Sequence, residues 1–378
     1  MPETHDVTPG VSLAAIGWDT TREEQFTPWA AEGGTPGRVA RVDRANLLVL
    51  TAATAVRAEP STALRREAEA SRDTSVLPAA GDWVALRPRA QSEVGDVEAV
   101  LPRTGAFMHR APDAHGDSKR GPARGDAQVL AANVDVAFLV AAATDARAGR
   151  LERAAALAWE SGAAPVIVLT KADLASDVAR TVVMAEEAVP GVPVHLVDAL
   201  HGDGTEMLNA YVEGHRTVAL LGASGVGKST LANALLGSEV LATGAVRESD
   251  GRGRHTTVAR HLVPLPGGGA IIDTPGLCSI VLCGADEGIA QVFSDVAALA
   301  AECRFRDCSH DREPGCAVRE AIQRGDLDAK RLERYRRLER ERAHLERRAD
   351  PVAQAEQRKY WAQINKSQRQ RPDKKHRS

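Results

Sequence analysis

The order of apolar and polar positions marks out a first region of short strands. Between residues 37 and 102, apolar runs alternate with turn signals such as Asp43-Arg44-Ala45-Asn46. Short strands separated by turns predict a small β-barrel. The predicted strands are 39–42, 47–56, 82–86 and 94–101. The charged segment 57–75 is interpreted as a mobile loop of this barrel.

A different pattern begins near residue 129. Apolar runs of strand length alternate with helical segments up to residue 275, which predicts a parallel sheet covered by helices on both faces. The predicted strands are 135–142, 165–170, 192–197, 217–221 and 270–272, and the predicted helices are 150–161, 178–188, 205–211 and 229–236. Residues 289–348 have a helical pattern around a cluster of cysteines and a histidine.

The two ends of the chain lack such patterns. Residues 1–36 are rich in Pro, Gly, Thr and charge, and we expect a poorly ordered extension there. The predicted organisation is a disordered extension at 1–36, a barrel at 37–108, an α/β nucleotide-binding domain at 125–286, a helical metal-binding domain at 287–350 and a basic tail at 351–378.

The amino-acid composition limits which side chains build the core, which partners the protein binds and in which compartment we expect it. Of 378 residues, 43% are hydrophobic and only 3% aromatic, so alanine, valine and leucine must build the core. Because the formal net charge is −3, nucleic-acid contacts have to come from local basic patches. The sequence shows neither the roughly 18 apolar residues of a membrane helix nor a secretion signal, and five cysteines are too few for a disulfide scaffold. We expect a cytoplasmic monomer that makes no membrane contact.

The strongest motif is Gly222-Ala-Ser-Gly-Val-Gly-Lys-Ser229, which fits G-x-x-x-x-G-K-[ST] between a strand and a helix. Its glycines let backbone N–H groups converge on phosphate oxygens at the positive end of a helix. Lys228 is expected to reach the β- and γ-phosphates and assist catalysis, and Ser229 to ligate Mg²⁺. The alternative is a glycine-rich turn that binds no ligand. The predicted nucleotide contacts here are Gly222, Ala223, Ser224, Gly225, Val226, Gly227, Lys228, Ser229 and Thr230.

Two further segments are candidates for binding Mg²⁺ and the γ-phosphate. Asp273-Thr-Pro-Gly276 follows an apolar strand, so Asp273 would hold Mg²⁺ through water and the Gly276 N–H would bond the γ-phosphate. The glycine-rich loop 251–257 lies between the two motifs. Its Thr256 and Thr257 are candidate Mg²⁺ ligands in a segment that the γ-phosphate would order. An ordinary surface loop is the alternative.

Thr170-Lys171-Ala172-Asp173 predicts which base is bound. An Asp carboxylate accepts hydrogen bonds from the N1–H and N2–H₂ groups of guanine, and adenine offers no such pair. Lys171 would pack along the base plane, and the Ala199 N–H, after the next strand, could bond guanine O6. Asp173 precedes Gly222, whereas most P-loop GTPases place the phosphate loop first. The motif order is therefore circularly permuted.

The metal cluster is Cys303-x4-Cys308-x-His310-x5-Cys316. Three thiolates and an imidazole form a closed tetrahedral set that is typical of structural Zn²⁺. Unrelated cysteines are the alternative, and for Cys278 and Cys283, outside the cluster, buried thiols are the preferred interpretation.

Taken together, these motifs resemble the RsgA family of ribosome-small-subunit-dependent GTPases, also called YjeQ or YloQ. The resemblance covers about residues 38 to 345. It includes Gly81-Asp-Trp-Val84, Leu101-Pro-Arg103, Ala132-Asn-Val-Asp135, Gly253-Arg-His-Thr-Thr257, Cys303-Arg-Phe305 and Glu313-Pro-Gly-Cys-Ala-Val318. It implies an OB-fold, a permuted GTPase domain and a zinc domain. It also implies a role on rRNA in late maturation of the small ribosomal subunit, which stimulates GTP hydrolysis.

Some positions depart from the family pattern or from Ras-like enzymes. Thr170 stands where the family often has Asn, and Asp198 replaces the usual Ser. Leu277 occupies the place of the Gln that orients water in Ras-like enzymes, so intrinsic hydrolysis should be slow. His255 is the candidate within the chain to complete the site, and an exposed loop histidine is the alternative.

Residues 358–378 carry eight Lys or Arg against one Asp. We prefer phosphate contact with rRNA over a merely solvated tail. Two other classes remain open from the sequence: a P-loop ATPase or small-molecule kinase, and an RNA-binding module that holds GTP without useful turnover.

Overall fold

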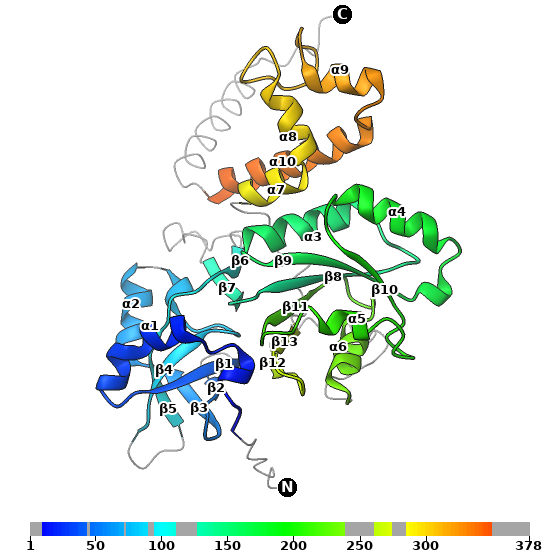
Figure 1. The fold of residues 1–378 in the computed structure, drawn as a ribbon. Coiled ribbons are helices and arrows are strands. Elements are labelled where there is room, and N and C mark those ends of the chain that lie inside the picture. Colours follow the sequence, from blue (N-terminus) through cyan, green and yellow to red (C-terminus); the bar gives the residue numbers. More distant parts are fainter. Residues whose placement is uncertain are drawn as a thin grey trace, which may run out of the picture.

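The computed structural model describes residues 10–43, 46–71, 73–89, 94–110, 127–238, 261–273 and 285–349. Three parts follow one another along the chain: a barrel, an α/β sheet and a group of helices (Figure 1). The sheet lies in the middle and contacts both other parts. This agrees with the predicted multidomain fold.

Five strands close the barrel. They are β1 (Thr35–Asp43), β2 (Asn46–Leu50), β3 (Ala55–Pro60), β4 (Trp83–Arg87) and β5 (Val94–Val100). The strands pair in the order β1-β2-β3-β5-β4 and close through β1–β4, and only β3 and β5 run parallel. This is an OB-fold, as predicted. Its interior is filled by small apolar side chains, among them the fully buried Val39, Val49, Val84 and Val97.

The prediction of a disordered extension is wrong for residues 10–36. They contain a 3-10 turn, η1 (Ala14–Ile16), and helix α1 (Thr20–Ala31), whose N-cap Asp19 accepts a 2.8 Å hydrogen bond from the Arg22 N–H. Phe26 is buried, and Trp18 packs edge-on against Phe26 and Trp83. A few apolar anchors therefore order a segment that is polar on average.

The segment 57–75 is also not a loop. Strand β3 continues to Pro60, and helix α2 (Thr62–Ser71) follows it and buries Leu64 and Ala68, which lie one helical turn apart. The predicted strand 47–56 is divided into β2 and β3 by a turn in which Thr51 Oγ1 donates to the Thr54 carbonyl at 2.6 Å. The helix escaped prediction because only one narrow face of it is apolar.

The central sheet runs β10-β9-β8-β11-β13-β12. Its strands are β8 (Val136–Ala142), β9 (Ala164–Thr170), β10 (Val194–Val197), β11 (Thr217–Leu221), β12 (His261–Pro264) and β13 (Ala270–Asp273). The five predicted strands are present and parallel, whereas β12, which pairs antiparallel with β13, was not predicted. The hairpin of β6 (Ala106–Arg110) and β7 (Ala127–Ala132) was also missed.

Helices cover both faces of this sheet (Figure 1). The helices are α3 (Ala148–Glu160), α4 (Val178–Ala188), the short α5 (Glu206–Asn209) and α6 (Lys228–Leu236). One core layer joins Leu139 and Leu169 of the sheet to α3 and α4. The other joins Phe138 and Leu220 to α5 and α6. Both faces are buried, which explains why the strands were recognisable as continuous apolar runs.

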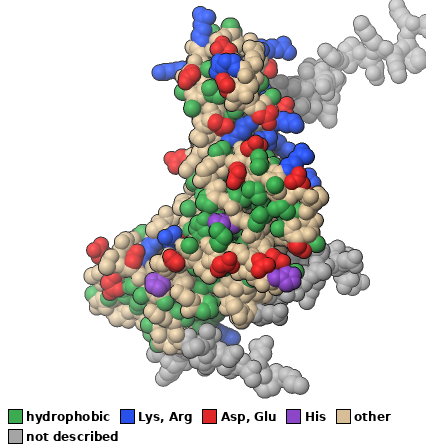
Figure 2. Space-filling model, turned by 45° about the vertical axis from the view of Figure 1, so that its right-hand side comes forward, with side chains coloured by type: hydrophobic (Ala, Val, Ile, Leu, Met, Phe, Trp, Pro, Cys, Tyr) green, Lys and Arg blue, Asp and Glu red, His purple; other side chains and the backbone are tan. Residues whose placement is uncertain are grey.

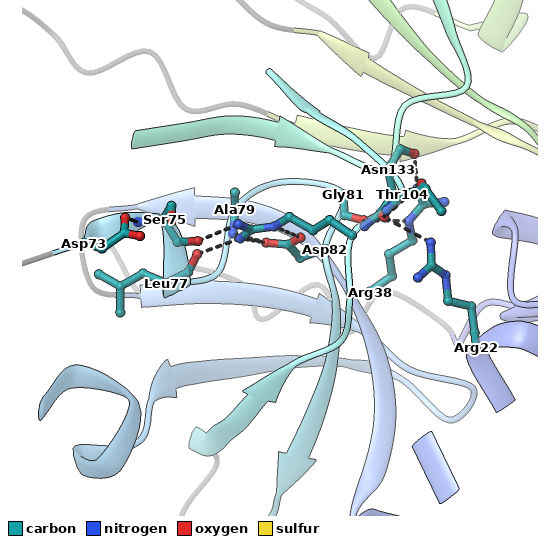
Figure 3. Close-up of polar contacts among 11 residues, drawn as sticks. Arg22, Arg38, Asp73, Ser75, Leu77, Ala79, Gly81, Asp82, Thr104 and Asn133 are labelled. Carbon is teal, nitrogen blue, oxygen red and sulfur yellow. Dashed lines mark hydrogen bonds and ion pairs between the residues drawn. The ribbon is translucent and has the colours of Figure 1, made fainter. Parts of the chain in front are cut away.

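A buried polar junction connects barrel and sheet (Figure 3). Arg38 of β1 is 1% exposed, and its Nη2 donates to Thr217 Oγ1 at 2.7 Å and to the Asn133 carbonyl at 3.3 Å. The side-chain oxygen of Asn133 accepts from Arg22 at 3.0 Å and from the Thr104 N–H at 3.0 Å. Strand β1 also pairs with β12. The barrel, its N-terminal helix and the sheet thus share one hydrogen-bond network.

The remaining helices are α7 (Asp286–Val292), α8 (Ser294–Ala301), α9 (Ala317–Arg324) and α10 (Ala329–Ala349). Gly288 of α7 lies so close to α3 that a Cβ there would be 2.0 Å from the Ala156 carbonyl oxygen. The buried Arg331 of α10 bonds Glu152 of α3 at 3.0 Å and Asp295 of α8 at 2.8 Å. Among the described helices, none has the length and apolar character needed to cross a membrane.

Candidate nucleotide-binding site

The phosphate loop connects β11 to α6, as predicted. Gly225 and Gly227 have φ values of 80° and 99°, which only glycine adopts readily. At Gly222 the restriction is space, because a Cβ would lie 2.4 Å from the Val140 carbonyl oxygen. The loop therefore passes close to β8 and turns sharply into the N-terminus of α6, a geometry suited to binding phosphate.

Lys228, the first residue of α6, folds back over the loop. Its Nζ donates to the carbonyls of Gly222 and Ala223, each at 2.8 Å. Asp273 ends β13, whose neighbour is β11, so it faces the same end of the sheet. Burial raises the pKa of Asp273, and the nearby positive charge of Lys228 opposes this rise. The structure thus brings the predicted phosphate-binding lysine and the predicted metal-side carboxylate together.

The base motif meets the phosphate loop directly. Thr170, the last residue of β9, donates from Oγ1 to the Val226 carbonyl at 2.6 Å. Lys171 has φ 56°, and its Nζ donates to the Gly225 carbonyl at 2.7 Å. These contacts join segments more than fifty positions apart in the chain. Thr170 replaces the expected Asn, and its hydroxyl provides a link between the two loops.

Asp173 and Ala199 lie at the same edge. Asp173 sits in the exposed 3-10 turn η3 (Ala172–Leu174). Strand β10 pairs in parallel with β9, Val197 opposite Thr170, so the turn containing Ala199 emerges beside the Lys171 loop. The arrangement places one carboxylate and one backbone amide at a single end of the sheet, next to the phosphate loop.

The cysteine and histidine cluster is also assembled. The ligand atoms of Cys303, Cys308, His310 and Cys316 all lie within 4.8 Å of one another. The Sγ atoms of Cys303 and Cys316 are 3.9 Å apart, and His310 Nδ1 is 3.6 and 3.5 Å from them. This group could hold a metal ion.

Several predicted site residues lie outside the described part of the chain. They are His255, Thr256, Thr257 and Gly276, together with Leu277, Cys278, Cys283 and the basic tail 351–378. Their proposed roles remain predictions.

Sequence reasoning missed one polar pair in the site. His201 Nδ1 is 2.6 Å from Asp198 Oδ2, in the turn after β10. An Asp followed three positions later by His after a strand is too common a pattern to single out. Only the folded turn shows that the two side chains are paired.

The fold and these loops define a P-loop nucleotide hydrolase with circularly permuted motifs. The RsgA GTPase family model matches residues 117–282. The chain is 47% identical to "Small ribosomal subunit biogenesis GTPase RsgA" of Streptomyces coelicolor, over 93% of this chain and 92% of that protein. It is 44% identical to the protein of that name from Opitutus terrae, over 96% and 98%.

Solved structures agree in fold. YjeQ of Thermotoga maritima matches with a TM-score of 0.58 and 24% identity, over 81% of this chain and 97% of YjeQ. YloQ, described as a circularly permuted GTPase, matches with a TM-score of 0.53 and 22% identity, over 80% and 92%. The chain belongs to the RsgA GTPase family, and it is a GTPase, as the sequence predicted.

Proposed function

We propose that this protein hydrolyses GTP in the maturation of the small ribosomal subunit and that the subunit stimulates the reaction. The observation that carries the proposal is the 47% identity, over 93% of the chain, with a relative named as a small ribosomal subunit biogenesis GTPase. Such work takes place in the cytoplasm, on a partner that consists of rRNA and protein.

The contacts at the sheet edge support specific roles within that reaction. Lys228 holds the β- and γ-phosphates, and Ser229 and Asp273 hold Mg²⁺, which when bound neutralises charge on the phosphate oxygens. Asp173 accepts from the guanine N1–H and N2–H₂ groups, and the Lys171 stem covers the base. Their sequence motifs, which lie outside the described part of the chain, are the basis for assigning Thr256, Thr257 and Gly276 to the γ-phosphate and Mg²⁺ and His255 to orienting the attacking water.

We also assign Zn²⁺ to the Cys₃His cluster. Zn–S bonds of about 2.3 Å at tetrahedral angles place two sulfur atoms about 3.8 Å apart. The separation of 3.9 Å between Cys303 and Cys316 fits this value. Because four protein ligands fill the tetrahedron, the ion has a structural role and stabilises the loops between α8 and α9.

The helical part also offers a surface for rRNA. Three exposed arginines lie between the ligands of this cluster along the chain: Arg304, Arg306 and Arg312. Phe305 is 41% exposed, and the Arg304 guanidinium lies 5.5 Å from the centre of its ring. Figure 2 shows Lys and Arg side chains on this part and where it joins the sheet. Cationic and aromatic side chains together suit contact with phosphates and unstacked bases.

The decisive experiment measures phosphate release from GTP and from ATP, with and without small ribosomal subunits. We expect slow release from GTP alone, much faster release with subunits, and little release from ATP. Preferential use of ATP would support an ATPase or kinase instead. GTP binding without release in the presence of subunits would identify an RNA-binding module that holds GTP without turnover.

A further inference from the structure

The turn after β10 is organised around one carboxylate. Oδ1 of Asp198 accepts from the N–H groups of Leu200 at 3.0 Å and His201 at 3.3 Å. Oδ2 is 2.6 Å from Nδ1 of the His201 ring. The backbone closes the turn, because the Asp198 N–H donates to the Asp203 carbonyl at 2.9 Å and the Gly202 N–H donates to the Asp198 carbonyl at 2.8 Å. The His201 imidazole therefore fixes the Asp198 carboxylate, and that carboxylate fixes the backbone of the turn.

These bonds engage the amides on both sides of Ala199 but not its own. The N–H groups of Asp198, Leu200, His201 and Gly202 all donate within the turn. In the described part of the chain, the Ala199 N–H has no hydrogen-bond partner. A turn built in this way leaves one amide to meet an acceptor from outside.

The turn also lies near the base-reading loop. The hydrogen bond between the His201 ring and Asp198 raises the pKa of His201, and the carboxylates of Asp203 and Asp173 raise it further. Asp198 and Asp203 belong to its own turn, and Asp173 belongs to the turn after β9. Protonated His201 thus offsets part of the negative charge of Asp198, Asp203 and Asp173.

We propose that His201 is a positioning residue for guanine recognition: by holding Asp198, it fixes the turn that presents the Ala199 N–H to guanine O6. The proposal rests on the proposed roles of Asp173 and Ala199 in reading the base. Guanine carries an acceptor at position 6 and adenine a donor, so a fixed N–H at this point favours guanine. Asp173 accepts from N1–H and N2–H₂, at the other end of the same edge of the base. The Ala199 contact therefore depends on O6, and the Asp173 contact depends on N1–H and the 2-amino group.

The test compares dissociation constants for GDP and IDP, measured with the full-length protein. IDP keeps O6 and N1–H but lacks the 2-amino group. In His201→Ala, we expect both affinities to fall by about 2- to 10-fold, the range for one hydrogen bond, with an unchanged GDP/IDP ratio. In Asp173→Ala, the preference for GDP should be lost, so the IDP dissociation constant divided by the GDP dissociation constant should fall towards one. Glu206→Ala, an exposed change at the start of α5, is the matched control and should leave both constants unchanged.

His201→Asn separates the hydrogen bond from the charge, because its amide nitrogen can take the place of Nδ1. We expect it to recover most of the affinity. In the wild type, GDP binding should weaken as the pH rises through the raised pKa of His201, and neither variant should show this loss. Since the His201 side chain is 73% exposed, the melting temperatures of the variants should match that of the wild type.

The role of His201 and the base site itself can be refuted by different results. If His201→Ala binds GDP and IDP as the wild type does while Asp173→Ala loses discrimination, the role of His201 is refuted and the base site stands. If Asp173→Ala keeps the wild-type GDP/IDP ratio, the proposed base site is itself refuted. A wild-type pH profile identical to that of His201→Ala would also overturn the role of His201.

Discussion

Nη2 of Arg38 lies 2.7 Å from Oγ1 of Thr217. Arg38 belongs to the first barrel strand, and Thr217 begins the strand that leads into the phosphate loop. Burial lowers the pKa of Arg38 to about 10, so the group remains charged at neutral pH, and the nearby Asp135 favours that charge. A charged side chain in the interior thus joins the OB-fold directly to the strand that positions the nucleotide site.

Removal of this side chain should destabilise the protein. Arg38→Met leaves the carbonyls of Ile16 and Asn133 and the Thr217 hydroxyl without their buried donor. We expect a loss of about 2–4 kcal/mol in the free energy of unfolding, measured in urea. Arg57→Met is the matched control, because Arg57 lies on an exposed face of β3. Equal stabilities for the two variants would contradict a structural role for the junction.

The phosphate loop should not tolerate a methyl group at Gly222. The Cβ of Gly222→Ala would lie 2.4 Å from the Val140 carbonyl oxygen, so the loop must move away from β8. We expect GTP affinity to fall about 10-fold or more, or about 1.4 kcal/mol, in a fluorescent-nucleotide titration. Gly267→Ala is the control, since nothing lies within 4 Å of its Cβ position. Wild-type affinity in Gly222→Ala would show that the loop does not bind phosphate in this geometry.

Glu313 should control how firmly the metal is held. Its carboxylate accepts from the N–H groups of Ser309 at 3.1 Å, Asp311 at 2.9 Å and Arg312 at 3.0 Å, and so fixes the loop that carries His310. We expect one zinc ion per chain, and about 10-fold weaker zinc binding in Glu313→Ala, from competition with a chromogenic chelator. Glu320→Ala, an exposed change on α9, should retain wild-type binding.

The Glu313 carboxylate also predicts that the stability of its loop depends on pH. The Ser309 hydroxyl, first among several donors, lowers the pKa of Glu313 to about 2. Because the pKa is lowered, the stabilising contribution is present above its usual value of 4.5 and is lost as the pH falls towards 2. The difference between wild type and Glu313→Ala in loop protection by hydrogen exchange should therefore disappear in that range. A difference that grows with falling pH would contradict this assignment.

His255 should affect turnover and not binding. If it orients the attacking water, His255→Ala lowers subunit-stimulated phosphate release by about 100-fold or more and leaves GTP affinity close to that of the wild type. His5→Ala, near the chain's start, serves as the control. Wild-type turnover in His255→Ala would remove this residue from the mechanism.

The basic tail should contribute affinity that depends on salt. Deletion of residues 358–378 removes eight positive charges and should weaken binding to small subunits. The slope of log affinity against log salt concentration should decrease by about 0.7–0.9 for each phosphate group that the tail neutralises in the full chain. Deletion of residues 1–9 is the control. Identical salt slopes for the full chain and the shortened chain would refute phosphate binding by the tail.

Much of the fold was readable from the sequence because its strands are buried on both sides. The run Thr217–Leu221 was predicted at its observed bounds, and the phosphate loop could be placed between that strand and α6. The motif types predict that the base motif and the phosphate loop lie at the same edge of a parallel sheet. The particular contact between Thr170 and Val226 is known only from the structure.

The rest depended on tertiary packing that leaves little trace in local sequence. Helix α1 is ordered by Phe26 and Trp18, which pack against the barrel. The sequence around these two residues is mostly polar, so it does not indicate that the barrel is their packing partner. Strand β12 is only four residues long and pairs antiparallel, so neither its length nor its pattern was distinctive. The pairing of Asp198 with His201 exists only because the turn between them closes.

The permuted order of strands also determines how the sheet is completed during synthesis. Strands β8, β9 and β10 leave the ribosome before β11, although β11 is the neighbour of β8 in the finished sheet. Until residues 217–221 emerge, the seven-residue β8 presents an unpaired apolar edge to the cell. The nascent chain therefore passes through a stage that is prone to edge-to-edge aggregation, and slow translation between residues 197 and 217 would prolong it.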